Sequence, residues 1–265
     1  MSDFITDGSF EIAKTKNYIL SIQVSLDGFS FLIADPVEKK IVGLKNSPYK
    51  ISSDNLLSRR LKEWFENEEI LKSQFKSVRI FIYSENFTLV PSEYFGHEKN
   101  RHLTSVLFDK TPGNNFIENK IEDLNSTLFY PVSQDVLSVL NQFFSKGFEI
   151  IHPIKILIET KVETKKRNLS IILSTKNFFY LVVFANNKLI LANSFQTLHI
   201  NDLIYNILNA FQQLEIARSE TDLFVAGAIN QNTDIEKLLK PYFDNIELLK
   251  AKDLIGNPAV FESTN

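Results

Sequence analysis

Two stretches that lie far apart in the chain repeat one pattern. LSIQVSLDGFSFLI at residues 20–33 matches LSIILSTKNFFYLV at 169–182 without a gap. Each stretch has β-forming residues on both sides of a short polar turn, which is typical of a β-hairpin. Self-similarity of this kind predicts a chain built from two copies of one structural unit. The residues that recur are Leu20, Ser21, Ile22, Ser25, Phe29 and Leu32, which return as Leu169, Ser170, Ile171, Ser174, Phe178 and Leu181.

The segments that follow the two hairpins also agree in kind and order. Each half continues with a third apolar run, then a stretch with apolar residues at three- and four-residue steps, which predicts a helix, then a further strand. The order strand, strand, strand, helix, strand therefore predicts an α/β fold with a mixed sheet and helices in each half, and we expect each sheet to have five strands. In the first half these segments are 39–46, 55–72 and 77–84, and in the second half they are 187–194, 201–216 and 221–228.

The remaining segments complete the two halves. A hairpin is predicted at 116–132 and an amphipathic helix at 133–147, and the second half ends with a short helix at 233–243 and a strand. We expect a first lobe at 1–150 and a second at 151–265. Pro153 suits the beginning of a helix, so we expect residues 152–166 to form a helix between the lobes.

Two lobes that each open with a hairpin resemble the actin-like ATPases and sugar kinases, whose RNase H-like lobes face a central cleft. Three segments resemble, more narrowly, an uncharacterised Bacteroidetes family, domain of unknown function 3822 (DUF3822), which is described as having an actin-like ATPase fold. The resemblance covers most of the chain and implies that fold, but it brings no known reaction. Its segments are YILSIQVSLDGFSFLIAD (18–35), NFTLVPSEYF (86–95) and TLFYPV (127–132).

The resemblance implies a nucleotide site at the two hairpin turns. In active members of this superfamily both turns carry glycines, whose backbone N–H groups approach the phosphates, and carboxylates that hold Mg²⁺. Here the first turn reads Ser25-Leu26-Asp27-Gly28, and the matching second turn reads Ser174-Thr175-Lys176-Asn177. Ser25 stands where the aspartate is expected, and the second turn has neither an acid nor a glycine. The acids and glycines of a working ATPase are therefore largely missing.

The residues that could still line a nucleotide site each have a structural alternative. Asp27-Gly28 is also the typical pair of a type I′ hairpin turn. Lys176 could contact a phosphate or could be a solvated turn lysine. LFVAGAINQN (223–232) resembles a loop that packs against adenine, but small residues also serve tight packing alone. The candidate cleft residues are Ser25, Asp27, Gly28, Ser174, Thr175, Lys176, Gly227 and Asn230.

Composition excludes several other classes of protein. The chain has no cysteine, so it has neither disulfides nor a thiolate nucleophile, which fits a reducing compartment. Lys and Arg total 29 against 32 Asp and Glu, so the net charge of −3 favours neither nucleic acid nor anionic membrane. The four histidines show no metal-ligand or catalytic-triad spacing. No secretory leader or membrane span is recognisable, and we expect a cytoplasmic protein.

The sequence leaves three alternative functions. The sequence favours a non-catalytic, degenerate ATPase that binds an unknown protein partner, with no metal and no cofactor. The alternative is an atypical nucleotide-binding protein or weak ATPase, in which Asp27 and Lys176 support ATP with Mg²⁺. The third is an enzyme of another kind on a two-lobed scaffold.

Overall fold

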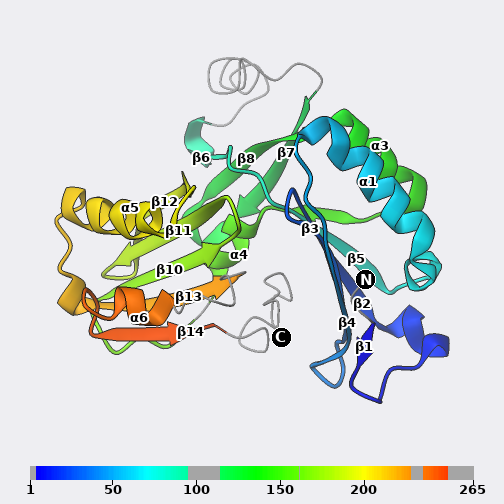
Figure 1. Cartoon of the computed structure of the whole chain (residues 1–265), viewed down its shortest axis with the longest axis horizontal. Helices are drawn as coiled ribbons and strands as arrows, with labels where there is room; N and C mark the ends of the chain where they lie inside the picture. Colours follow the sequence, from blue (N-terminus) through cyan, green and yellow to red (C-terminus); the bar gives the residue numbers. More distant parts are fainter. Residues whose placement is uncertain (1–3, 95–113, 161, 228–234, 250–265) are drawn as a thin grey trace. The chain divides into compact units, whose positions relative to one another are not determined.

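The computed structural model describes residues 4–94, 114–160, 162–227 and 235–249. The chain divides into two compact units, Met1–Lys155 (unit 1) and Ile156–Asn265 (unit 2), which are coloured from blue to green and from green to red in Figure 1. Within the described residues, no helix has both the length and the apolar character needed to cross a membrane.

Unit 1 is built on a mixed sheet with the strand order β1-β4-β3-β2-β5-β9. Strands β2, β3 and β4 pair antiparallel, whereas β5 and β9 run parallel to β2. A separate three-stranded antiparallel sheet has the order β6-β8-β7. The strands are β1 (Ile5–Thr6), β2 (Ile19–Ser25), β3 (Gly28–Asp35), β4 (Lys40–Pro48), β5 (Ser77–Ile82), β6 (Thr88–Pro91), β7 (Asn114–Ile121), β8 (Ser126–Ser133) and β9 (Glu149–Ile151).

Two helices, α1 (Asp54–Asn67) and α3 (Gln134–Phe143), lie side by side over unit 1 (Figure 1). The apolar residues of α1 recur at three- and four-residue steps, so one stripe of the helix faces the sheet. Trp64 lies in that stripe, and its ring centroid is 5.2 Å from Phe29 and 6.1 Å from Phe31 of β3. Short 3₁₀ helices complete the unit: η1 (Ile12–Asn17), η2 (Glu69–Lys72), η3 (Ser92–Tyr94) and η4 (Glu122–Leu124).

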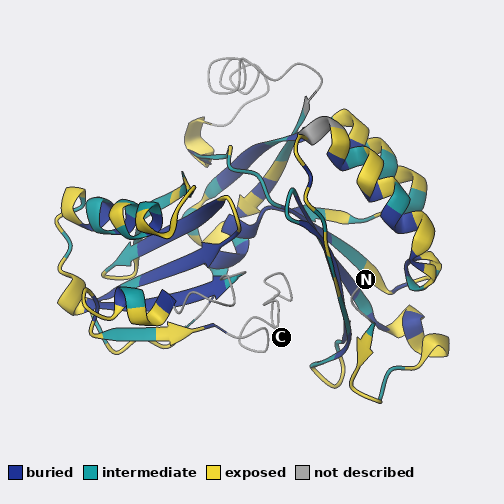
Figure 2. Ribbon diagram, viewed as in Figure 1, coloured by how far each residue is buried: buried dark blue, intermediate teal, exposed yellow. Residues whose placement is uncertain are grey.

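Unit 2 is built on a five-stranded mixed sheet with the order β12-β11-β10-β13-β14. Helices α5 and α6 supply the apolar side chains that pack with those of β10, β11 and β13 in one core. Figure 2 shows the central strands of each unit as its most buried part. The boundary between the units falls within α4 (Pro153–Glu159). The other elements of unit 2 are β10 (Asn168–Ser174), β11 (Phe178–Ala185), β12 (Lys188–Gln196), α5 (Ile200–Gln213), η5 (Arg218–Glu220), β13 (Thr221–Gly227), α6 (Ile235–Leu239) and β14 (Asn245–Leu248).

The two units contain the same hairpin, but in a register one residue away from that of the sequence match. In β2 and β3, Ser25 pairs with Gly28, and the equivalent closing contact in unit 2 joins Thr175 and Phe178. The ladder then continues through Ser174 and Phe179. Residue n of the first hairpin therefore corresponds to n + 150, since 175 − 25 = 150, whereas the sequence match implied 149, since 174 − 25 = 149.

Packing and irregularities support this structural register. Phe29 and Phe31 face α1 in unit 1, and their equivalents Phe179 and Leu181 belong to the core that contains α5 in unit 2. A β-bulge follows Ile33 in β3, and its equivalent follows Val183 in β11. Because a one-residue slip turns every side chain to the opposite face, the recurring residues of the sequence match are not structural equivalents. The duplication itself is present.

Three other details differ from the prediction. The main sheet of unit 1 has six strands rather than five, because Ile5–Thr6 adds to the edge of β4. The predicted hairpin at 116–132 forms, but in the separate sheet with β6. The helix expected at 152–166 covers only Pro153–Glu159. The backbone N–H groups of Lys165 and Lys166 donate instead to the Asp222 carboxylate, at 2.6 and 3.0 Å.

Candidate functional site

The first hairpin turn is held by the hydroxyl of Ser25. Its Oγ accepts a hydrogen bond from the N–H of Asp27 and donates to the carbonyl oxygen of Gly28, both at 3.2 Å. The carbonyl oxygens of Leu26 and Asp27 accept hydrogen bonds from backbone N–H groups that follow β4, each at 3.1 Å. The Ser25 side chain, which stands where the aspartate was expected, is therefore part of the structure of the turn.

The geometry of this turn is not type I′, as Asp27-Gly28 had suggested. Leu26 and Asp27 are the two central residues, and neither has a positive φ. Gly28 has φ +136° and begins β3. A Cβ at Gly28 would lie 2.5 Å from the carbonyl oxygen of Ser47, so this position needs glycine because β4 passes close to it.

The second hairpin turn repeats this arrangement with a threonine. Thr175 Oγ1 donates to the carbonyl oxygen of Phe178 at 2.6 Å and accepts from its N–H at 3.2 Å. The carbonyl oxygen of Asn177 accepts from the N–H of Thr197 at 2.8 Å, as that of Asp27 does from Tyr49. Thr175 rather than Ser174 thus corresponds to Ser25, and an amide side chain stands where unit 1 has Asp27.

Gly227 lies beside the second turn, where β13 pairs with the end of β10. It has φ +97°, and a Cβ there would lie 2.1 Å from the carbonyl oxygen of Ser174. The glycine is therefore required by the close approach of two strands.

The structure brings the predicted site residues together within each unit. Ser25, Asp27 and Gly28 share the first turn, and Ser174, Thr175, Lys176 and Gly227 lie around the second. Asn230 lies outside the described residues. Asp27 is the only carboxylate within either turn, and the part of the chain that the structure describes holds no group of three or more His, Asp or Glu residues that could bind a metal ion.

A buried polar network around His152 is a feature that the sequence did not reveal. The side chain is fully buried, with Nε2 3.0 Å from the carbonyl oxygen of Ser84, while Nδ1 accepts from the N–H of Ile154 at 3.2 Å. The His152 N–H donates to Asn119 Oδ1 at 2.7 Å, and the Tyr130 hydroxyl donates to the same oxygen at 3.1 Å. Burial lowers the pKa of His152 to about 3, against a smaller opposite effect of its hydrogen bond to Ser84.

The neutral state of His152 satisfies both ring nitrogens, because Nε2 carries the proton that Ser84 accepts and Nδ1 has the lone pair that Ile154 needs. A proton on Nδ1 would point at the N–H of Ile154. This histidine is therefore suited to holding structure in unit 1 and not to proton transfer with a ligand.

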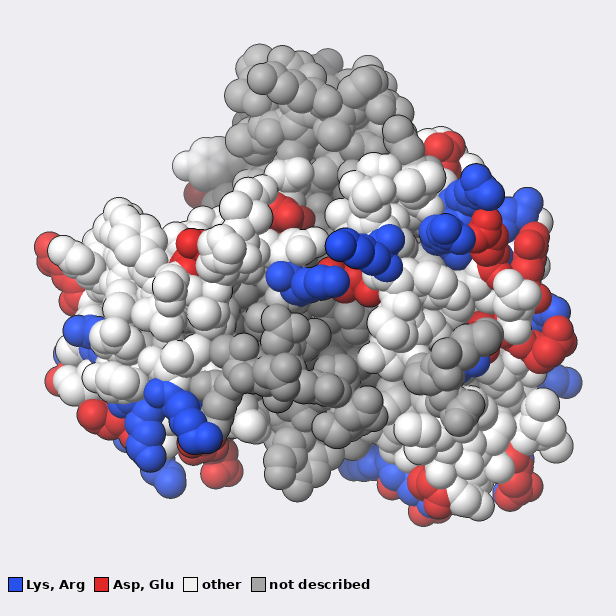
Figure 3. Space-filling view, in the orientation of Figure 1, with Lys and Arg blue, Asp and Glu red and all other residues white. Residues whose placement is uncertain are grey.

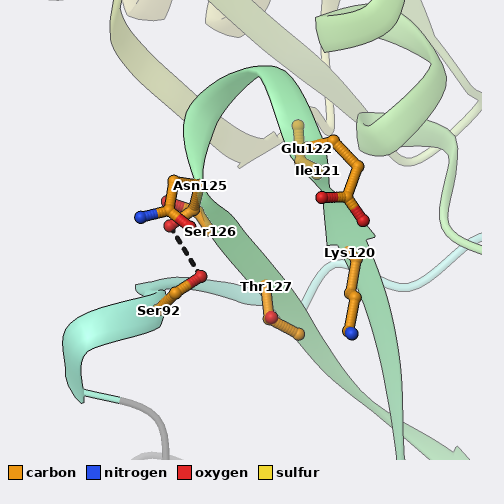
Figure 4. A pocket seen from close by; sticks show the side chains of 7 residues that line it. All are labelled: Ser92, Lys120, Ile121, Glu122, Asn125, Ser126 and Thr127. Carbon is orange, nitrogen blue, oxygen red and sulfur yellow. Dashed lines mark hydrogen bonds between the residues drawn. The ribbon is translucent and has the colours of Figure 1, made fainter.

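A cavity of about 320 Å³ lies at the end of the β7–β8 hairpin (Figure 4). It is lined by one lysine and one glutamate among hydroxyl and amide groups, and Ser92 Oγ donates to the carbonyl oxygen of Asn125 at 2.8 Å. None of the predicted site residues lines it. The lining residues are Ser92, Lys120, Ile121, Glu122, Asn125, Ser126 and Thr127.

Charges of both signs are interleaved on α1, which lies at the right of the face in Figure 3. Arg59 and Arg60 both pair with Glu63, at 3.0 and 2.9 Å. A surface of paired charges produces no extended field of one sign. This helix therefore offers no basic stripe for a polyanion.

Comparisons with known proteins agree with the fold. Residues 7–246 match a family described as "Protein of unknown function (DUF3822)". A crystal structure from Bacteroides thetaiotaomicron, of a protein with actin-like ATPase fold and unknown function, is 24% identical, with a TM-score of 0.80 over 94% of this chain and 99% of that one. The PilM-PilN type IV pilus biogenesis complex is 11% identical, with a TM-score of 0.53 over 92% and 90%. No curated protein matches. These likenesses show an actin-like ATPase fold.

Proposed function

Because this chain belongs to the DUF3822 family and has an actin-like ATPase fold without an assigned reaction, we propose that it is a non-catalytic binding module whose ligand is a protein. Phosphoryl transfer on this fold depends on metal ions and groups that neutralise charge on the phosphates.

The observation that carries the proposal is the use of the two turn hydroxyls. Ser25 and Thr175 each donate to and accept from the backbone of their own turn. A hydroxyl in that role cannot replace a carboxylate, which would bring a negative charge and up to four acceptor positions for metal-bound waters. With Asp27 as the one acid of the two turns and Asn177 at its equivalent position, the residues do not fit a magnesium nucleotide.

A protein ligand is supported by a likeness of fold. A chain of the PilM-PilN type IV pilus biogenesis complex, which is an assembly of two proteins, shares the architecture at low identity. Partner binding is therefore compatible with this architecture. We extend partner binding to this chain and propose that its ligand is a protein.

Nucleotide binding provides the decisive test. The thermal unfolding temperature is measured with and without millimolar Mg-ATP and Mg-ADP. A ligand present at about 100 times its Kd would stabilise the fold by about 2.7 kcal/mol, which is a shift of several degrees. We expect no shift for the natural chain.

Two variants test whether any nucleotide-dependent shift arises at the hairpin turns. Asp27→Asn gives the first turn the side chain that the second already has, and Lys176→Ala removes the cation of the second turn. A nucleotide-dependent shift that either variant abolishes would overturn the proposal and establish the atypical nucleotide-binding alternative.

A further inference from the structure

In each unit the strand that follows the hairpin, β4 in unit 1 and β12 in unit 2, pairs with the hairpin on one side. A further described strand pairs with the other side of β4 but not of β12. In unit 1 the free side of β4 pairs with β1. In unit 2, β12 pairs with β11 on one side and with no other described strand. An uncovered edge presents backbone N–H and C=O groups to which another strand can pair.

Unit 1 shows how such an edge is covered. Ile5 pairs with Leu44 and Thr6 with Gly43 in the antiparallel sense. The N–H of Asp7 then donates to the carbonyl oxygen of Val42 at 3.4 Å. The Asp7 carboxylate lies 3.9 Å from Nζ of Lys40, the first residue of β4. The covering segment is thus a short strand followed by an acid that meets a lysine.

Strand β12 has residues equivalent to those of β4, but no described strand pairs with its outer side. Both β4 and β12 begin with a lysine, both follow it with a bulge, and the pairs Asp35–Lys40 and Ala185–Lys188 close the two turns. Lys188 therefore corresponds to Lys40, but it forms no ion pair with any described residue. Ile190 corresponds to Val42, and it is 38% exposed whereas Val42 is 1% exposed.

We infer that the Lys188–Ala192 edge of β12 binds an extended segment of a partner protein, which pairs antiparallel and carries a carboxylate that meets Lys188. This inference rests on the proposed function, and it specifies where the partner protein binds and which groups the partner contributes. Main-chain hydrogen bonds provide the attachment in this mode of recognition, and side-chain positions provide selectivity. The antiparallel direction places the acid after the paired residues, as Asp7 follows Thr6 in unit 1.

At one position the partner segment must differ from the N-terminal segment that pairs with β4 in unit 1. The ring of Phe4 lies against Gly43, where a Cβ would come within 2.7 Å of it. The equivalent residue of β12 is Leu191, whose side chain packs against the core of unit 2. A ring placed on β12 as Phe4 is placed on β4 would therefore meet the side chain of Leu191, so the partner segment has a small residue there.

The test uses a synthetic peptide that copies residues 2–9 with the change Phe4→Ala, titrated to millimolar concentration into the isotopically labelled full chain. Backbone amide NMR signals report where it binds. We expect shifts at residues 188–192. Lys188→Glu should weaken binding roughly tenfold and Asp7→Asn in the peptide about threefold, as expected for an exposed ion pair reversed or neutralised. The exposed Lys240→Glu serves as the matched control and should leave binding unchanged.

The outcomes separate this inference from the proposal on which it rests. Shifts absent from 188–192, or equal in the Lys188→Glu chain, would overturn the edge site even if Mg-ATP again fails to bind, and the binding-module proposal would then stand without it. Stabilisation by Mg-ATP would overturn the proposed function whatever the peptide does. A concentration-dependent dimer that Ile190→Asp abolishes would assign the edge to a second copy and overturn the assignment to another protein.

Discussion

The buried histidine of unit 1 makes the stability of that unit depend on pH in a calculable way. His152 is neutral when folded, since both ring nitrogens are satisfied in that state and burial lowers its pKa to about 3. In the unfolded chain the same side chain has a pKa of about 6.5. The unfolded chain therefore binds a proton between these two values that the folded chain does not.

The sign and size of the effect follow from this difference. Above about pH 6.5 the histidine is neutral in both states and adds no pH dependence. As the pH falls toward 3, the free energy of unfolding decreases by about 1.4 kcal/mol for each pH unit. Between about pH 7.5 and about pH 5 the loss amounts to about 2 kcal/mol.

Urea unfolding at these two pH values measures the loss. The chain has one tryptophan, Trp64, which is buried in unit 1, so its fluorescence reports the unit that holds His152. In His152→Gln the difference between the two pH values should shrink by about 2 kcal/mol, whatever the variant loses in overall stability. Tyr130→Phe is the matched control, because it removes a hydrogen bond from the same network but leaves the imidazole in place. The reasoning is refuted if His152→Gln keeps the pH dependence of the natural chain.

Two further predictions for unit 1 use the same fluorescence readout. Gly28→Ala should destabilise by about 3 kcal/mol through strain and the clash with β4, whereas Gly147→Ala, which also has a positive φ but open space around it, should cost about 1 kcal/mol; equal losses would contradict the close-approach argument. Lys45→Met should cost about 3 to 5 kcal/mol, because it strands the buried carboxylate of Glu68, whose oxygen lies 2.8 Å from Nζ. The double variant Lys45→Met with Glu68→Leu should recover most of that loss, and no recovery would show that the cost lies elsewhere.

The order of elements in both units could be predicted from the sequence, because each element carries its own signal. The helices α1 and α5 show apolar residues at helical spacing, and the hairpins show long runs of β-forming residues around a polar turn. These signals are local, so they survive without knowledge of the neighbours. Order and repetition together were enough to predict a duplicated α/β chain.

The register of the duplication could not be predicted in the same way. Strand β3 is buried at nearly every position, so it lacks the alternation that would show which side chains face the helices. Several identical residues then favoured an alignment that is one residue wrong. What determines the true register is the hydroxyl that holds each turn, Ser25 in one unit and Thr175 in the other, together with the bulge.

Features that depend on distant residues were also missed. The two residues of β1 are too few to form a pattern, and they are a strand only because β4 lies beside them. The backbone N–H groups of Lys165 and Lys166, which the sequence placed in a helix, donate to the Asp222 carboxylate, which lies far along the chain. Gly28 suggested a type I′ turn, but its role comes from the approach of Ser47.

The N-terminal strand on β4 also limits how many strand-shaped ligands one molecule can accept. With that strand in place, the outer side of β4 is occupied, so of the two strands that follow the hairpins only β12 has a side with no described strand beside it. Removal of residues 1–10 would bare the β4 edge as well, so that each molecule would present two such edges. Pairing of the β4 edge of one molecule with the β12 edge of the next is a heterologous contact, which grows into an open-ended polymer unless its geometry closes a ring.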